Sequence, residues 1–344
     1  MISDGKKVFM MRVNKETRII NAKSSKTFPR KKRTQIERKS VAVILGYYNG
    51  EAYIEEQLFS IFNQSHKSLH VFLYDDYSAP QFILQNINSE GVQRSKISAT
   101  VRPKNIGFAN NFMKALADIK KPFEFYSFSD QDDIWNKNKL EIAISALSDI
   151  SSEIPALYCA RTEIVDEQCA ESLGYSPLFT KDPTFSNALV QNIGGGNTMV
   201  FNKAARDLII SSVSNCTIVS HDWWCYLIVT GAGGHVIYDA KPCLKYRQHK
   251  TNVIGSNTSW RGRFSRFCSL LQGHFLELND INTKALEINK HLLTKDNLYI
   301  LDNFMNGRRT NLIKRLILLK RSKIYRQTLL GNIGLLVGIF FKRI

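Results

Sequence analysis

The apolar residues in the first half of the chain form short continuous runs separated by stretches with helical spacing. The runs that fit buried strands are VAVILGYY (41–48), VFLYDD (71–76), ISATVR (97–102) and FEFYSF (123–128). The stretches that repeat apolar residues every three or four positions are 51–64, 108–119 and 139–150. Strands that alternate with helices predict an α/β fold with a mainly parallel sheet, covered on both faces.

Beyond residue 150 the alternation is less regular. Strands are predicted at 156–161, 198–202 and 235–240, with a glycine-rich turn, NIGGGNT, at 192–198. From about residue 256 the sequence is helical and basic. It includes a 14-residue apolar segment, 328–341, which is shorter than the roughly 20 residues that cross a bilayer. This segment is expected to be interfacial or re-entrant, or else a packed helix.

The net charge of +17 is concentrated at the two ends of the sequence. Residues 1–39 hold 13 Lys/Arg and 3 acids, and residues 308–344 hold 10 Lys/Arg and no acid, which leaves −3 for the middle. Nucleic-acid-binding proteins usually spread a basic stripe over the folded surface, so no nucleic-acid partner is expected. Basic ends around a near-neutral body fit an anionic membrane surface, and a solvated, flexible tail is the alternative for residues 1–39.

The six cysteines are scattered and include no CxxC pair. This spacing argues against a zinc site and against a disulfide scaffold. No apolar stretch of a secretory signal is found near residue 1. These observations predict reduced thiols and a cytoplasmic protein.

Three carboxylates follow the fourth predicted strand in the sequence SDQDD (129–133). Asp130 and Asp132 point the same way along an extended segment, so they can converge on one point. Converging carboxylates repel unless a cation lies between them or one is protonated. Oxygen ligands suit Mg²⁺ or Mn²⁺. Asp133 is expected to begin the next helix, and Trp135 to pack behind the loop.

Further polar residues follow other strands. Asp75 and Asp76 follow the second strand, where an acid can accept hydrogen bonds from a ribose or base, although Asp is also common in turns. The stretch GYYNGE (46–51) places tyrosines beside an Asn-Gly turn. The carboxyl ends of parallel strands bind ligands in open α/β sheets, so these acids are expected to share one site.

Two later motifs could serve the same site. HDWW (221–224) places an Asp beside two tryptophans that could contact a sugar, although the motif alone favours two core tryptophans. KYRQH (245–249) contains Arg247, which suits phosphate, and His249, which suits a metal or phosphate; a surface loop is the alternative.

In this order the motifs resemble family-2 glycosyltransferases, most closely a rhamnosyltransferase-like bacterial subgroup that builds surface polysaccharides. The resemblance covers about residues 40–255 and is carried by VAVILGYYNGEAYIEEQLFSIFNQS, DDYS, RPKNIGFANNF, FSDQDDIW, GGGNTMVFNK, HDWW and YRQHKTNVIG. It implies a GT-A catalytic domain at 40–255, a nucleoside-diphosphate sugar donor, Mg²⁺ or Mn²⁺, and inversion at the anomeric carbon. Residues 256–344 then form a helical, membrane-associated region.

Carried over by position, the resemblance implies these roles. Asp222 is the general base, Asp132 and Asp130 match the DxD metal positions, and His249 joins them. The nucleotide pocket is formed by Tyr48, Asn49, Glu51, Asp75, Asp76 and Asn105. The donor and acceptor side is formed by Trp135, Gly195, Gly196, Trp223, Trp224 and Arg247, with Arg247 and His249 closing over the diphosphate.

The chain departs from the family after Asp76. Tyr77 replaces the glycine of a DDGST-like stretch, and Ala79-Pro80 replaces a polar pair, which leaves the shape of that loop open. The expected acceptor is a hydroxyl of a glycan or lipid-linked molecule at the inner membrane surface. The residues leave the donor sugar, the linkage and the oligomeric state open. The alternatives are a metal-dependent nucleotidyl- or phosphotransferase, which would release pyrophosphate rather than nucleoside diphosphate, and a non-enzymatic nucleic-acid-binding protein.

Overall fold

The computed structural model describes residues 38–249 and 274–344. Most of the predicted basic extension (1–37), and the segment 250–273 that contains the start of the predicted helical region, lie outside these residues. The five cysteines in the described ranges, Cys159, Cys169, Cys216, Cys225 and Cys243, are free thiols, as predicted.

The described residues form one nine-stranded sheet in the order β3-β2-β1-β4-β8-β6-β9-β5, with β7 paired to β6. The strands are β1 (Val41–Tyr47), β2 (Leu69–Asp75), β3 (Ile97–Val101), β4 (Phe125–Ser129), β5 (Ile134–Trp135), β6 (Ala156–Val165), β7 (Ser172–Tyr175), β8 (Val200–Asn202) and β9 (His235–Arg247). The first four strands are parallel, as predicted. Further along, β8 is antiparallel to both β4 and β6, so the complete sheet is mixed.

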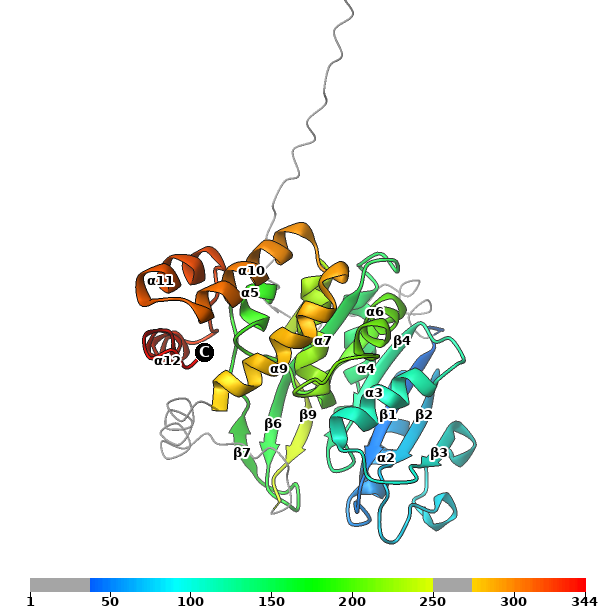
Figure 1. The fold of residues 1–344 in the computed structure, drawn as a ribbon. Coiled ribbons are helices and arrows are strands. Elements are labelled where there is room, and N and C mark those ends of the chain that lie inside the picture. Colours follow the sequence, from blue (N-terminus) through cyan, green and yellow to red (C-terminus); the bar gives the residue numbers. More distant parts are fainter. Residues whose placement is uncertain (1–37, 250–273) are drawn as a thin grey trace, which may run out of the picture.

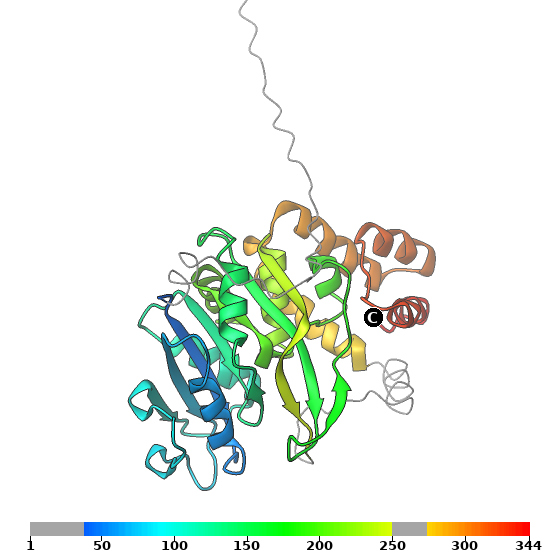
Figure 2. The same ribbon diagram turned by 180° about the vertical axis from the view of Figure 1, so that it is seen from behind.

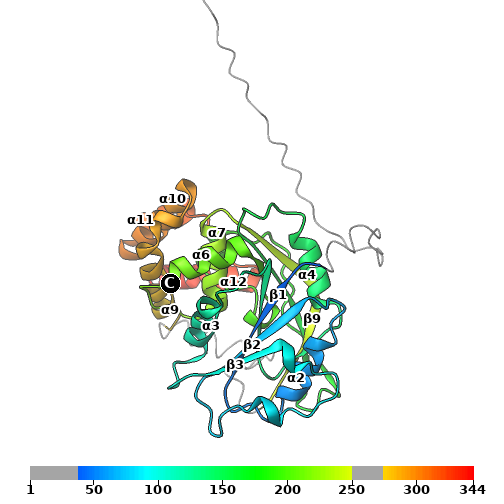
Figure 3. The same cartoon turned by 90° about the vertical axis from the view of Figure 1, so that its right-hand side faces the viewer.

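Helices cover both faces of the sheet. They are α2 (Ile54–Phe62), α3 (Phe108–Asp118), α4 (Lys139–Leu147), α5 (Phe185–Ala188), α6 (Lys203–Val213), α7 (His221–Gly231), α9 (His274–Ile288), α10 (Lys295–Arg309), α11 (Leu312–Arg321) and α12 (Leu329–Phe340). Figure 3 shows α3, α6 and α7 on one face and α2 and α4 on the other.

Each face has its own hydrophobic cluster, because successive residues of β1 point to opposite sides. Ala42 and Ile44 pack with α3 and α7, whereas Val41, Val43 and Leu45 pack with α2 and α4. All five β1 residues named here are completely buried. The continuous apolar run at 41–48 is therefore explained by burial on both faces.

The helices from α9 onward lie together at one end of the molecule, away from β1–β3 (Figures 1 and 2). Leu286, Leu301, Phe304 and Leu335 belong to the same hydrophobic cluster as α7. The predicted helical character of this region is confirmed from residue 274 onward. Within the described ranges, no helix is both long enough and apolar enough to cross a membrane.

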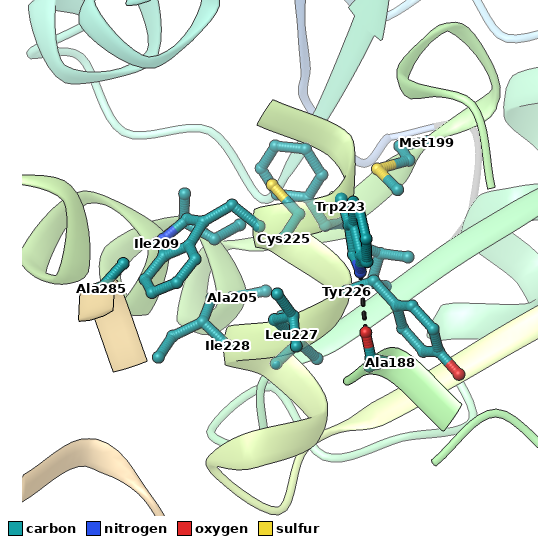
Figure 4. Close-up of a cluster of buried hydrophobic side chains, with 14 of the residues drawn as sticks. Ala188, Met199, Ala205, Ile209, Trp223, Cys225, Tyr226, Leu227, Ile228 and Ala285 are labelled. Carbon is teal, nitrogen blue, oxygen red and sulfur yellow. Dashed lines mark hydrogen bonds between the residues drawn. The ribbon is translucent and has the colours of Figure 1, made fainter. Parts of the chain in front are cut away.

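Helix α7 lies in the middle of this cluster and contains both tryptophans of the HDWW motif. Trp223 is 7% exposed and its indole nitrogen donates to the Ala188 carbonyl at 2.7 Å (Figure 4). Trp224 is fully buried and donates to Ser212 Oγ at 2.9 Å. Both tryptophans are therefore core residues, as the motif alone suggested, and their contact with an acceptor stays a prediction.

This burial yields a prediction for Trp224→Ala. Loss of the indole leaves a cavity and removes the hydrogen bond that Ser212 Oγ accepts, so the free energy of unfolding should fall by about 3–5 kcal/mol. Urea denaturation measures the change, with Tyr299→Ala on the exposed surface of α10 as the control, expected within about 0.5 kcal/mol of the parent protein. Unchanged stability together with weaker acceptor binding would contradict the core assignment.

Candidate active site

The acids predicted to share a site are brought to one edge of the sheet. Strand β1 lies between β2 and β4, with Tyr47 opposite Asp75 and Leu45 opposite Ser129. The segments that leave the carboxyl ends of these three strands therefore start side by side. Residues far apart in the sequence can build one site there.

The loop after β1 is bound to both neighbouring loops. The side-chain amide of Gln131 donates to the Tyr48 carbonyl at 3.0 Å and accepts from the Tyr48 amide at 2.7 Å. Asn49 has a left-handed φ of 47°, its amide donates to Ser78 Oγ, and its side chain accepts from the Ala79 amide. The Tyr48 ring remains half exposed, which leaves its face available to a flat ligand.

Asp75 and Asp76 are both buried and organise the loops that follow them. Asp75 accepts from the amide and hydroxyl of Ser78 and from the Phe82 amide, which engages both of its carboxylate oxygens. Asp76 accepts from the amides of Ile106 and Gly107, at 2.9 Å each. The structure thus shows these two acids shaping the loops after β2 and β3, and their contact with a base stays a prediction.

Tyr77 adopts the conformation that favours glycine. Its φ is 71°, in the left-handed region, and its side chain is 52% exposed. The Ala79–Pro80 peptide bond is cis. The turn keeps a glycine-like backbone at Tyr77 and displays an exposed aromatic ring.

Glu51 and Asn105 lie at the exposed rim of the same region. Burial raises the pKa of the Tyr47 hydroxyl, and the charge of Glu51 and its hydrogen bond to this hydroxyl add to the shift. The side chain of Asn105 accepts from the Gly107 amide at 3.1 Å, next to the start of α3. Gly107 has a φ of 79°, a conformation that glycine adopts readily.

The acidic loop, residues 130–133 after β4, brings negative charges close together, as the sequence predicted. Burial, followed by the charges of Asp132 and Asp222, raises the pKa of Asp130 to about 7. Asp132 lies 2.8 Å from His249, measured from Oδ2 to Nε2, and the imidazole stacks on Tyr53 at 4.7 Å between ring centroids. The loop therefore approaches both the candidate metal ligand His249 and the candidate base Asp222.

Asp133 does not begin the next helix, which corrects the expectation for this residue. It is 1% exposed, and its Oδ2 accepts from Asn197 Nδ2 at 2.7 Å, while α4 begins at Lys139. Burial and the charges of Asp132 and Asp130 raise its pKa well above the usual value. Asp133 is thus an internal anchor of the loop, held by a residue of the glycine-rich turn.

Lys139 is a site residue that sequence reasoning missed. It is 1% exposed, donates to the Asn197 carbonyl at 2.7 Å, and lies 3.3 Å above the Trp135 ring. Burial lowers its pKa to about 7, while the charges of Cys243, Asp133 and Asp130 oppose that shift. The signal in the sequence was a lysine shortly after the SDQDD acids. The helical spacing of 139–150 did not distinguish it from an ordinary lysine on a helix surface.

Trp135 holds the loop and does not form part of an open donor surface. It is 3% exposed, its amide donates to Ser60 Oγ at 3.0 Å, and its strand β5 pairs with β9. The expectation that it packs behind the loop is confirmed. The ring lies in the core beneath Lys139, and a contact of Trp135 with donor or acceptor stays a prediction.

The glycine-rich turn lies between the acidic loop and α7. A side chain at Gly195 would meet Asn197 Oδ1, and one at Gly196 would lie 2.1 Å from His221 Nε2. His221 stacks on Phe112 at 4.2 Å, and neither of its ring nitrogens has a hydrogen-bond partner within the described part of the chain. These two glycines therefore permit close packing against Asn197 and His221, and a donor or acceptor contact by them stays a prediction.

Asp222 lies in the first turn of α7, where the helix dipole stabilises a negative charge. Its Oδ1 accepts from Ser220 Oγ at 2.5 Å and from the Trp223 amide at 2.7 Å. It is 9% exposed and near enough to Asp130 to raise the pKa of that group. An oriented carboxylate of this kind can accept a proton.

Arg247 does not face an open phosphate site. Its guanidinium donates to the Asp132 carbonyl at 3.0 Å, to the Glu167 carbonyl and to the Glu56 carboxylate, and it lies 5.0 Å from the Tyr53 ring centroid. The side chain is 4% exposed. Arg247 thus ties β9 to the acidic loop and α2, and its role over the diphosphate stays a prediction.

Comparison with known proteins decides the family. Residues 42–208 match Glycosyl transferase family 2. The chain is 30% identical to dTDP-rhamnosyl transferase RfbG of Shigella flexneri over 234 residues, 64% of this chain and 76% of that protein. The chain belongs to glycosyl transferase family 2. The GT-A fold and the glycosyltransferase class are confirmed. They are favoured over a nucleotidyl- or phosphotransferase and over a nucleic-acid-binding protein.

Two further similarities are more distant. The glycosyltransferase is 24% identical to an uncharacterized glycosyltransferase of Haemophilus influenzae over 182 residues, 47% of this chain and 55% of that protein. The crystal structure of S. aureus TarS residues 1–349 in complex with UDP-GlcNAc matches with a TM-score of 0.48 and 14% identity, over 83% of this chain and 89% of that chain.

The site of this glycosyltransferase fits a divalent ion when a ligand supplies further oxygens. Asp132 and His249 form a carboxylate–imidazole pair, and Asp130 is close by. Within the described ranges, no three His, Cys, Asp or Glu side chains are grouped to hold a metal. Mg²⁺ in phosphate-handling enzymes commonly takes one or two carboxylates and completes its shell with phosphate oxygens and water. The residues therefore fit Mg²⁺ or Mn²⁺ bound together with a diphosphate.

The raised pKa of Asp130 predicts a pH-dependent effect of Asp130→Asn on stability. The folded state holds this proton more tightly than the unfolded state, so Asp130 favours folding below about pH 4 and loses that contribution as the pH rises to about 7. Asn does not titrate. In the metal-free protein, the variant should gain roughly 2 kcal/mol relative to the parent between pH 5 and pH 8, with the side chain's partial exposure allowed for.

Urea unfolding at the two pH values, with a chelator present, measures this difference. Glu90→Gln, an exposed loop acid, is the control and should leave the pH dependence unchanged. Parallel curves for Asp130→Asn and the parent protein would contradict the assignment of a raised pKa to Asp130.

Proposed function

We propose that this glycosyltransferase transfers rhamnose from a nucleoside-diphosphate sugar, with dTDP as the nucleotide, to a hydroxyl of a glycan or lipid-linked acceptor. The reaction inverts the anomeric carbon and serves surface polysaccharide synthesis at the inner face of the cell membrane. The observation that carries the proposal is that the glycine-rich turn brings Asp222 to the acidic loop: Gly196 packs against His221, the neighbour of Asp222, and Asn197 donates to Asp133 at 2.7 Å. The choice of sugar and nucleotide is supported by the similarity to the Shigella flexneri enzyme.

The proposed step is a single in-line displacement. The oxygen of the acceptor hydroxyl bonds to the anomeric carbon while Asp222 accepts the proton of that hydroxyl. The bond from the anomeric carbon to the diphosphate breaks on the opposite face. Ser220 and the Trp223 amide orient the Asp222 carboxylate by donating to Oδ1, which leaves Oδ2 for the proton. General-base assistance of this kind is typically worth about 10²–10⁴-fold in rate.

The acidic loop serves the leaving group. Asp132, with His249 and Asp130, would hold Mg²⁺ or Mn²⁺, and the ion would neutralise charge on the departing diphosphate. Arg247 and Asn197 hold this loop through the Asp132 carbonyl and the Asp133 carboxylate. The nucleotide would lie over the loops after β1 and β2, where the rings of Tyr48 and Tyr77 are about half exposed and can stack on a base.

Asp222→Asn should lower kcat by about 10²–10⁴-fold, because the amide keeps the shape of the side chain but cannot accept the proton. Binding of dTDP should stay within about twofold of the parent protein. Asp296→Asn, which removes a carboxylate from the first turn of α10, is the matched control and should keep full activity. Release of dTDP from dTDP-rhamnose in the presence of acceptor measures the rate, and full activity of Asp222→Asn would contradict its role as base.

Asp132→Ala should remove the metal dependence of nucleotide binding. In the parent protein, Mn²⁺ should strengthen dTDP binding by at least about tenfold, because the ion bridges the protein and the diphosphate. Isothermal titration with and without Mn²⁺ measures this, and Asp132→Ala should bind dTDP equally weakly in both conditions. An undiminished effect of Mn²⁺ on the variant would contradict the assignment of Asp132 as a ligand.

A further inference from the structure

Helices α11 and α12 expose an unusual amount of large apolar surface. Ile313 is 75% exposed and Leu329 is 77% exposed, values typical of side chains in full contact with solvent. Other apolar residues of the pair that are between about half and two-thirds exposed are Leu316, Ile317, Leu330, Ile333, Leu336 and Phe340. Exposed apolar patches of this kind mark interaction surfaces.

The exposed residues form one stripe on each helix. On α11, Ile313, Leu316 and Ile317 follow one another at intervals of three and one, while Arg315 and Leu319 on the opposite side are buried. On α12, Leu329, Ile333, Leu336 and Phe340 recur at intervals of four, three and four.

Leu335 and Ile339 face the interior from the other side of α12. Each helix is thus held by one face, and its second apolar face has no partner within the described part of the chain.

Two buried arginines fix the position of this pair. Arg315 donates to the carbonyls of Ile339 and Thr310, at 2.9 and 2.8 Å, and so joins α11 to the last turn of α12. Arg308 donates to the Ile344 carbonyl at 2.7 Å and to Asp280 of α9. The exposed stripes therefore belong to a folded surface.

The segment that carries the stripes has only positive charges. Residues 308–344 contain ten Lys/Arg and no Asp or Glu. Those with exposed side chains are Arg309, Lys314, Lys320, Arg321, Lys323, Lys342 and Arg343. Apolar stripes beside cations, with no acids, complement a surface that presents phosphate groups above hydrocarbon.

We infer that the exposed face of α11 and α12 docks onto an anionic lipid bilayer, with the apolar stripes at the headgroup boundary and the cations on lipid phosphates. α12 has 12 residues, or about 18 Å at 1.5 Å per residue, so it lies on a hydrocarbon core of roughly 30 Å and does not cross it. This inference specifies how the protein would contact the membrane named in the proposed function. It rests on the proposed function only for the reason why the protein docks.

Co-sedimentation of the full-length protein with vesicles tests the inference. Vesicles of phosphatidylcholine with 30% phosphatidylglycerol should bind the protein at least about tenfold more tightly than pure phosphatidylcholine, and binding should weaken as salt rises. The triple variant Leu329→Gln, Ile333→Gln and Leu336→Gln should bind at least about tenfold more weakly. The control Leu173→Gln and Leu178→Gln changes similarly exposed leucines near β7 and should bind like the parent.

Two results would overturn the inference. Parent-like vesicle binding by the α12 triple variant would place the bilayer contact elsewhere, such as the basic residues 1–39. A lipid-free dimer of the parent that becomes a monomer in this variant would show that the face covers a second copy.

Binding of dTDP, measured without vesicles, should be the same in the variant, and Asp222→Asn should still bind vesicles. A failure of docking is therefore distinguishable from a failure of the proposed chemistry.

Discussion

Asn197 connects a buried acid and a buried amine, and the acidic loop depends on this arrangement. Its side chain donates to Asp133, and its backbone carbonyl accepts from Lys139. Burial disfavours the charged forms of both groups, and close polar partners offset the hydration that the two side chains lose. With Asp133 secured inside, Asp130 and Asp132 keep their partly exposed positions at the sheet edge.

The same residue relates the acidic loop to the candidate base. Asn197 follows Gly195 and Gly196 in the turn, and Gly196 packs against His221, the neighbour of Asp222. The two centres of negative charge are thus positioned by one short turn, although they come from β4 and α7. A catalytic base and a leaving-group site must keep a fixed separation. Here the backbone of the turn and the ring of His221 hold that separation, and neither can move far.

The sequence predicted the elements that are buried on both faces and the acids that follow them. Runs such as 41–48 and 123–128 fit strands because their central residues, 41–45 and 125–128, are buried between the helix layers. It also placed Asp75, Asp130 and Asp132 at one edge, since parallel neighbours end together.

Residues whose role depends on distant partners were not predictable from local pattern. Arg247 looks like a phosphate ligand until Glu56 and the Asp132 carbonyl surround it. Lys139 looks like a helix surface residue until Asn197 and Trp135 enclose it. In each case the local sequence describes the side chain's chemistry, and the tertiary fold decides what it faces.

Tyr77 shows that the turn after β2 does not need glycine to follow its path. A non-glycine residue in the left-handed region costs about 1–2 kcal/mol. The bond that Asp75 accepts from the Ser78 amide spans Tyr77, and the bond that Asp76 accepts from the Ile106 amide fixes the preceding residue. The backbone shape and the side chain displayed are therefore separable at this position. Nucleotide preference among such enzymes could diverge at residue 77 by exchange of one exposed side chain, with the supporting loop left intact.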